Sequence, residues 1–359
     1  MSDISDRASP GATPLGESAE TERAERAEED SARAAARARK RARQRRGRTA
    51  RLSAAGLVLF LSLFRLLPIS WALFFARRLG ALAWWLLPSR RAIADENLKI
   101  AFGDRYTARE RRRIGRRSIE RFAMTIIEGV LLPDWIRTGR LRGLVREGPG
   151  VAGAWERQQR GEPLLFFTGH FGAWEVGVRH LVRKGWRIAV PYRSTKNEFL
   201  QDWIVANRGI AGPEQFHRKG ALRAMVRVLR SGGAVTMFLD QNERNGIFVD
   251  FFGRPAATVP TVGALADRCD AAVYLQVVRR ITPGKDYTID FEGPLEIPEG
   301  GTPEERVAAW TQLATRRIEL RIRELPEDWL WIHRRWRTQP PAEAELSEKD
   351  RGDSARSLP

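Results

Sequence analysis

A histidine and a glutamate lie five residues apart where an apolar run ends. The run Leu164–Phe167 stops at Thr168, a glycine follows, and then come His170 and, five residues later, Glu175. A carboxylate in the first turn of a helix that begins near Gly172 would reach the imidazole and hold it in one tautomer. A histidine oriented in this way at the end of a buried strand is a general-base arrangement. The sequence therefore predicts His170 and Glu175 as catalytic residues.

The spacing alone is a weak signal. With 4 His and 44 Asp and Glu in 359 residues, about 0.5 such spacings arise by chance. On spacing alone, a capped helix whose histidine satisfies a backbone group is the favoured interpretation. The surrounding order of strand, glycine turn and helix favours a functional site, because open α/β sheets place their sites at the carboxyl ends of strands.

Further candidate residues stand at the ends of elements or in loops, where binding groups collect. They are Arg193, Arg208, Asp240 and Gln241. Each of them also fits a helix cap or a surface pair. Phe248 and Phe252, in a glycine-bounded loop, are candidates either for the core or for the lining of a hydrophobic channel. The aromatic and basic segment Trp329–Trp336 fits a nucleic-acid stacking surface or a docking site at the sheet edge.

Other chemistries lack candidates. The sequence has no glycine-rich dinucleotide motif, P-loop, HExxH or CxxC. The scattered histidines predict no metal site, and the missing GxSxG motif removes the usual route through an acyl-serine. The single cysteine, Cys269, cannot form a disulfide within the chain.

The elements that must position these residues alternate between strand and helix. Strands are predicted at 164–168, 187–192, 215–217, 234–239, 247–252, 272–278 and 287–292. Helices are predicted at 172–183, 198–207, 221–229, 262–268 and 303–325. This order predicts an α/β fold with a sheet flanked by helices.

The preceding part of the chain reads as a membrane-associated region. Residues 1–52 are expected to be a disordered tail, acidic and then polybasic. The apolar stretch 53–88 is expected to anchor the chain to a membrane, lying in the interface or spanning it marginally; a buried core hairpin is the alternative. Residues 90–137 are predicted to be helical throughout. The main domain is expected over 89–337, followed by a disordered tail, 338–359.

The formal net charge of +18 indicates a polyanionic partner, such as nucleic acid, an anionic membrane surface or a phosphorylated substrate. A nucleic-acid-binding protein would use the basic arm Arg33–Arg51 and the aromatic segment Trp329–Trp336. That function leaves the apolar stretch 53–88 and the His170–Glu175 pair without a role.

Several motifs together resemble those of bacterial lipid A biosynthesis acyltransferases of the lauroyl and myristoyl type. They are Thr168–Glu175, Tyr192-Arg193 with Lys196-Asn197, Asp240-Gln241, Gly246–Thr258, Trp331–Trp336, and Asn97-Leu98 with Phe102. The likeness covers residues 55–337. Two departures are Ala173, where many members have Asn, and Asp240-Gln241-Asn242, where some have Asp-His-Asp. Phosphatidylinositol-mannoside acyltransferases belong to the same superfamily, so the acceptor stays open between these glycolipids.

The resemblance implies a glycerolipid-acyltransferase-like mixed sheet with an N-terminal hydrophobic helical anchor. It implies transfer of a fatty acyl chain from acyl carrier protein or coenzyme A, as co-substrate and without a further cofactor, to a glycolipid hydroxyl. His170 would be the base, Glu175 would orient it, and Arg208 and Asp240 would shape the site. The implied partners are anionic membrane lipids, acidic acyl carrier protein and the glycolipid acceptor, with no nucleic acid. The implied location is the bacterial inner membrane, with the catalytic domain facing the cytoplasm.

Overall fold

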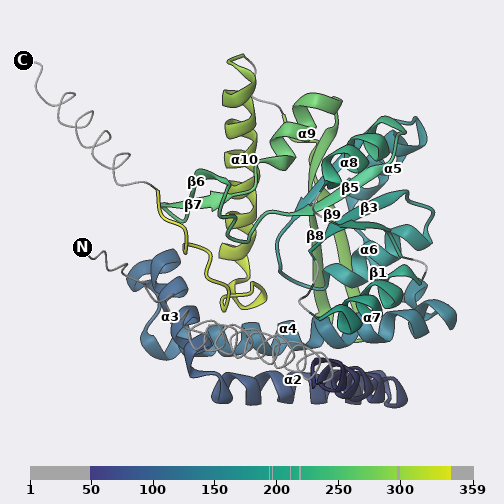
Figure 1. The fold of residues 1–359 in the computed structure, drawn as a ribbon, viewed down its shortest axis with the longest axis vertical. Coiled ribbons are helices and arrows are strands. Elements are labelled where there is room, and N and C mark those ends of the chain that lie inside the picture. Colours follow the sequence, from purple (N-terminus) through teal and green to yellow (C-terminus); the bar gives the residue numbers. More distant parts are fainter. Residues whose placement is uncertain are drawn as a thin grey trace, which may run out of the picture. The chain divides into compact units, whose positions relative to one another are not determined.

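The structure, a computed structural model, describes residues 49–193, 195, 197–210, 212–217, 220–296 and 300–340 (Figure 1). The predicted N-terminal tail up to residue 48 and the C-terminal tail beyond residue 340 lie outside this range. The chain divides into two compact units, Met1–Leu57 and Val58–Pro359. In the first unit the described residues, 49–57, are helical. The strands and helices labelled below belong to the second unit.

Among the described residues, seven strands form a mixed sheet in the order β1-β9-β8-β2-β5-β3-β4. Their bounds are β1 Val145–Glu147, β2 Leu164–Thr168, β3 Ile188–Tyr192, β4 Glu214–His217, β5 Ala234–Phe238, β8 Ala272–Thr282 and β9 Asp286–Glu292. The strands from β8 to β4 run parallel, whereas β9 and β1 run in the opposite direction. A separate antiparallel hairpin joins β6 Ile247–Phe251 to β7 Arg254–Thr258.

Helices flank this sheet, which confirms the predicted α/β class. The helices of the second unit include α2 Ile69–Leu86, α3 Pro88–Phe102, α4 Ala108–Arg137, α5 Pro149–Gln159, α6 Trp174–Arg183, α7 Glu198–Gly209, α8 Ala221–Arg230, α9 Thr261–Cys269 and α10 Pro303–Glu324. The predicted continuous helix over 90–137 is interrupted, because Gly103 ends α3 with φ +55° and Thr107 starts α4 through a capping box with Glu110. Residues 139–150, for which no strand or helix was predicted, contain β1 and the start of α5.

Strand β2 lies in the centre of the sheet, and all its residues are buried. Successive side chains point to opposite faces. Leu165 and Phe167 join one hydrophobic cluster, and Leu164 and Phe166 join the other. Because helices cover both faces, the strand has a continuous apolar sequence rather than an alternating one. This burial fixes the strand that precedes His170.

The apolar stretch 57–76, long enough in sequence to span a bilayer, does not form one helix. A 3₁₀ turn at Phe64–Leu66 and Pro68 separate α2 from the residues before it, since proline lacks an N–H and disfavours a helical residue before it. Among the described residues, one helix is long and apolar enough to cross a membrane by length and composition, Thr49–Leu66.

Helix α2 is apolar on two faces. Its small residues Ala72, Ala76 and Gly80 are buried, and a Cβ on Gly80 would lie 2.7 Å from the Cα of Glu120 on α4. The other face leaves aromatic and aliphatic side chains exposed, namely Trp71, Phe74, Phe75, Leu79, Leu82, Trp85 and Leu86. The alternative prediction for this stretch, a buried core hairpin, therefore explains the buried face of α2 but not the exposed one.

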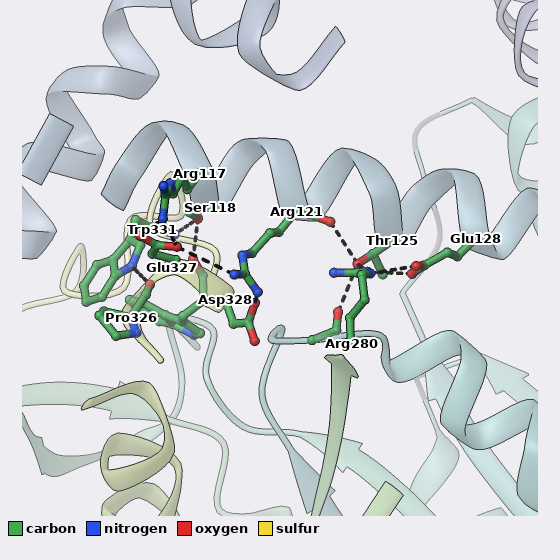
Figure 2. A network of polar contacts seen from close by, with 12 residues as sticks. Arg117, Ser118, Arg121, Thr125, Glu128, Arg280, Pro326, Glu327, Asp328 and Trp331 are labelled. Atoms are coloured by element: carbon green, nitrogen blue, oxygen red, sulfur yellow. Dashed lines mark hydrogen bonds and ion pairs between the residues drawn. The ribbon is translucent and has the colours of Figure 1, made fainter. Parts of the chain in front are cut away.

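Helix α4 carries a buried ion pair to the sheet (Figure 2). Arg280 of β8 donates to the carboxylate of Glu128 from Nε (2.7 Å) and Nη2 (2.5 Å), and Tyr287 donates its hydroxyl to Glu128 at 2.7 Å. The side chains of Arg280 and Glu128 are 2% and 0% exposed. Burial opposes the charge of Arg280, but the charge and hydrogen bonds of Glu128 outweigh it and raise its pKa. Arg280 also donates to the Thr125 hydroxyl, which donates to the carbonyl oxygen of Gly172 at 3.0 Å. The network thus reaches the loop after β2.

The same helix holds the segment that follows α10 (Figure 2). Arg117 pairs with Glu327 at 2.7 Å, Arg121 pairs with Asp328 at 2.5 Å, and the Ser118 hydroxyl donates to the carbonyl oxygen of Trp329. The polar face of α4 therefore fixes both the loop after β2 and the start of the C-terminal segment.

Candidate active site

His170 is held by Asp240. The Nδ1 atom of His170 lies 2.8 Å from Oδ1 of Asp240, and the backbone N–H of His170 donates to Oδ2 at 2.6 Å. Trp329 donates its indole N–H to the same Oδ2 at 2.7 Å. The side chain of Asp240 is 2% exposed and that of His170 is 21% exposed. The carboxylate is therefore enclosed behind an imidazole that faces solvent.

The parallel register of two central strands brings this pair together. Thr168 of β2 is the partner of Phe238 of β5. His170 and Asp240 each lie two residues beyond these partners, so they leave the sheet at the same edge. Two glycines allow the turn: Gly172 has φ +66°, and a Cβ there would lie 1.8 Å from the carbonyl oxygen of Val278. A Cβ on Gly169 would meet the ring of Phe171 at 2.7 Å.

Asp240 is ionised. Burial pushes its pKa upward, but the charge of His170, its ring and backbone hydrogen bonds, and the indole N–H of Trp329 outweigh burial and lower the pKa to about 2. An ionised carboxylate only accepts hydrogen bonds, so Nδ1 of His170 carries the proton. Whenever the ring is neutral, Nε2 is therefore its unprotonated nitrogen, and the amide nitrogen of Gln241 lies 3.3 Å from it. Asp240 and Gln241 thus meet the two ring nitrogens, and Nε2 is available to take a proton.

The prediction that Glu175 binds and orients the ring of His170 is wrong. The carboxylate of Glu175, in the first turn of α6, binds Arg208 at the end of α7. Since α6 begins at Trp174, Glu175 turns toward α7, and Asp240 at the end of the neighbouring strand takes the place beside the imidazole. Arg179 of α6 fixes the end of α7 by donating to the carbonyl oxygen of Asn207 at 3.0 Å. Glu175 and Arg208 therefore form a separate ion pair between two helices.

A cavity of about 370 Å³ opens beside His170. Three of the predicted residues line it: His170, Arg193 and Gln241. Its apolar wall comes from α8, β3, β5 and neighbouring loops through Pro191, Ala221, Leu222, Met225, Met237, Phe238 and Val259. The ring of Phe238 lies 4.5 Å from that of His170, between centroids. The imidazole therefore stands where a polar mouth meets an apolar interior.

Two predicted channel residues lie elsewhere. Phe252 is buried in the core, with its ring 5.5 Å from Phe102 and 4.8 Å from Phe251, so the core alternative is correct for it. Phe248 is 37% exposed on β6. Neither residue lines the cavity beside His170.

The C-terminal aromatic segment is not a stacking surface for nucleic acid. Trp329, Trp331 and Trp336 are 1%, 0% and 7% exposed. Trp329 also pairs with Phe171 through an isolated β-bridge. The segment packs behind the site and supplies a hydrogen bond to Asp240, which buried aromatic side chains with a polar atom commonly do.

The role of Trp329 and the residues of the cavity's apolar wall were not predicted from the sequence. The pairing of His170 with Asp240 did have a signal, since each residue follows a mostly apolar strand, Leu164–Thr168 or Ala234–Phe238. To use that signal, one would have had to know that these two strands are neighbours in the sheet. Met225 and Met237 carried no signal, because a buried methionine in a helix or strand is ordinary core material. In the described part of the chain, no three His, Cys, Asp or Glu side chains are grouped to hold a metal ion.

Comparison with known proteins identifies the family of this chain. The family model described as bacterial lipid A biosynthesis acyltransferase matches residues 43–338. The lipid A biosynthesis palmitoleoyltransferase of Escherichia coli K12 is 27% identical over 283 residues, 78% of this chain and 89% of the relative. The lauroyltransferase of the same organism is 27% identical over 265 residues, 73% and 84% of the two chains. The myristoyltransferase is 23% identical over 271 residues, 74% and 81%. The family match spans His170, Asp240 and the segment behind them, and the chain therefore belongs to the bacterial lipid A biosynthesis acyltransferases.

Proposed function

We propose that this acyltransferase moves a fatty acyl chain from an acyl thioester, carried by acyl carrier protein or coenzyme A, to a hydroxyl of a lipid A precursor or a similar glycolipid. The observation that carries the proposal is the His170–Asp240 pair at the mouth of a cavity with an apolar wall. The named relatives act in lipid A biosynthesis, which supports a glycolipid acceptor.

In this mechanism His170 is the general base. The acceptor hydroxyl displaces the Gln241 amide and donates to Nε2, which takes the proton as the oxygen attacks the thioester carbonyl. Asp240 stabilises the imidazolium that forms and keeps the ring in place. The tetrahedral intermediate then collapses, the carbon–sulfur bond breaks, and the proton on Nε2 passes to the leaving thiolate. No acyl-enzyme forms, and a general base contributes about 10²–10⁴ in rate.

The apolar wall suits the acyl chain. A hydrocarbon chain gains about 0.8 kcal/mol for each buried CH₂ group, so Met225, Met237 and Phe238 favour the donor chain over the sugar headgroup. Arg193 lies at the polar mouth, where its charge suits the phosphate of an acidic carrier or acceptor. Arg208, also predicted to bind substrate, pairs with Glu175 and does not line this cavity.

We also propose that the enzyme works on the inner membrane and faces the cytoplasm. The exposed aromatic face of α2 supports this location, since Trp and Phe side chains settle at the membrane interface. Arg78 and Arg91 lie over the rings of Phe74 and Trp85, 4.9 and 5.6 Å from their centroids, where they suit anionic headgroups. The Thr49–Leu66 helix is available as a further anchor.

The test is transfer of a labelled acyl chain from each thioester donor to lipid A precursors and to phosphatidylinositol mannosides, in detergent. His170→Ala should lower turnover by at least about 10²-fold with the protein folded and saturated with donor. His217→Ala, a histidine outside the cavity lining, is the matched control and should keep near wild-type turnover. Comparable turnover in both variants would exclude His170 as the base.

A further inference from the structure

The loop after β5 carries both groups that meet the ring of His170. Asp240 faces Nδ1 and Gln241 faces Nε2. The next residue, Asn242, makes no hydrogen bond to His170 among the contacts of the described residues, yet it belongs to the same short loop. The contacts of Asn242 show what holds this loop in place beside the imidazole ring of His170.

Three hydrogen bonds join Asn242 to the C-terminal segment. Its backbone N–H donates to Nε2 of His333 at 3.0 Å. Its amide Nδ2 donates to the hydroxyl of Thr338 at 3.0 Å, and its Oδ1 accepts from the backbone N–H of Thr338 at 3.1 Å. The side chain thus exchanges a donor and an acceptor with one residue 96 positions later in the sequence.

The segment that receives these bonds is itself fixed. Asn97 of α3, which is buried, donates to the carbonyl oxygens of Trp331 and His333, both at 2.7 Å. Arg335 is 0% exposed and donates to the carbonyl oxygen of Ala257 at 2.8 Å. Asn242 is therefore hydrogen-bonded to a C-terminal segment that is itself held in place by other parts of the chain.

His333 accepts the bond from Asn242 only while its Nε2 is unprotonated. Burial lowers the pKa of His333, and the charges of His170, Arg335 and Arg90 act in the same direction, whereas Asp240 opposes them. Neutral His333 at neutral pH therefore agrees with the geometry of the acceptor.

We propose that Asn242 is a positioning residue for His170: together with His333 and Thr338 it fixes the 240–243 loop, so that Asp240 and Gln241 meet the two ring nitrogens in one tautomer. The proposal rests on His170 as the base. A displacement of about 1 Å at a reacting group costs on the order of 10²-fold in rate, so a loop held by a few hydrogen bonds has a direct effect on turnover.

The experiment compares three variants of the full chain. Asn242→Ala removes both side-chain bonds to Thr338. Asn242→Asp keeps oxygen acceptors for the N–H and the hydroxyl of Thr338 and serves as the conservative replacement. Thr302→Ala removes the capping box of α10, a loss of about 1 kcal/mol of stability, and controls for general destabilisation.

Two readouts are measured. The first is kcat and KM for the acyl donor. The second is the tautomer of His170, read from the ¹⁵N shifts of the imidazoles in histidine-labelled protein; the chain has 4 histidines, and His170→Ala assigns the relevant signals. The expected result for Asn242→Ala is a kcat lower by about 10- to 100-fold, an unchanged KM and a mixture of tautomers. Asn242→Asp and Thr302→Ala should keep one tautomer and most of the turnover.

The proposal is overturned if folded Asn242→Ala keeps the wild-type tautomer, or if Thr302→Ala loses as much turnover as Asn242→Ala. The tautomer measurement also separates this inference from the proposed function. If the wild type transfers no acyl chain, the proposed function fails, and an unchanged tautomer in Asn242→Ala would refute the positioning role independently.

Discussion

Asp240 is the side chain on which the proposed base depends most directly. It accepts from the ring N–H and the backbone N–H of His170 and from Trp329, so each of its oxygens is in use. Because its pKa is lowered to about 2, the carboxylate is charged at neutral pH. The stabilisation that follows is present above the ordinary pKa of about 4 and is lost only as the pH falls toward 2.

Asp240→Asn tests this dependence. The amide removes the charge that stabilises the imidazolium and can present an N–H to Nδ1, which favours the wrong tautomer. Turnover should fall by about 10³–10⁴-fold, as expected when an orienting carboxylate beside a catalytic histidine becomes an amide. The measurement is kcat at saturating donor, with circular dichroism to show that the fold is kept. A loss below about tenfold would show that Asp240 is a structural acceptor.

At the scale of the elements, α4 joins helix α2 to the sheet. The Glu128–Arg280 pair is the buried part of that connection. Breaking one partner leaves an uncompensated charge in the interior, whereas replacing both partners removes the charge altogether. Variants at these two residues therefore distinguish the loss of stability caused by an unpaired buried charge from the net contribution of the ion pair to stability.

Glu128→Gln should lower the free energy of unfolding by about 3–5 kcal/mol. The double variant Glu128→Gln, Arg280→Met should be more stable than Glu128→Gln alone, because it leaves no buried guanidinium without a counter-charge. Both are measured by chemical denaturation of detergent-purified protein. Equal stability of the single variant and the wild type would show that water reaches the pair.

The exposed apolar face of α2 leads to a separate prediction about membrane binding. Replacing Trp71, Phe74 and Phe75 with Ser removes apolar area from the exposed face and leaves the buried residues Ala72 and Ala76 in place. Binding of a form that starts at residue 68 to anionic vesicles should weaken by at least tenfold in co-sedimentation, since burying one such side chain is worth about 1.5–3 kcal/mol. Unchanged binding would place the contact elsewhere.

For the whole molecule, two histidines with lowered pKa values, His180 and His333, predict how stability depends on pH. Burial lowers the pKa of His180 and of His333, in the first case against the opposing effect of Glu147. The unfolded chain, with a histidine pKa of about 6.5, therefore binds more protons than the folded chain just below that pH. Stability should be complete above pH 6.5 and should decrease as the pH falls through and below this value.

Denaturation between pH 5 and pH 8 measures this effect, above the range in which the paired carboxylates titrate. His333→Gln offers a neutral oxygen to the N–H of Asn242 and should flatten the curve in part, while His180 still titrates. A wild-type curve that is level from pH 8 to pH 5 would contradict the prediction.

The sequence by itself determined the class of the fold and the place of the site. The buried run 164–167 with its glycine turn predicted β2 and the loop of His170, and the alternation of elements predicted a sheet flanked by helices. These features depend on local properties, namely apolar periodicity and the φ angles that glycine allows. The motifs in the same stretches were sufficient for the likeness to the acyltransferase family.

Only the tertiary structure decided which carboxylate holds the imidazole. Glu175 is five residues from His170 and Asp240 is seventy, yet Asp240 is the neighbour, because β2 and β5 are adjacent and in register. The C-terminal segment likewise had a composition typical of nucleic-acid binding, but its tryptophans are buried behind Asp240 and on the core. Strand order and side-chain burial are set by contacts between distant parts of the chain, and no local pattern specifies them.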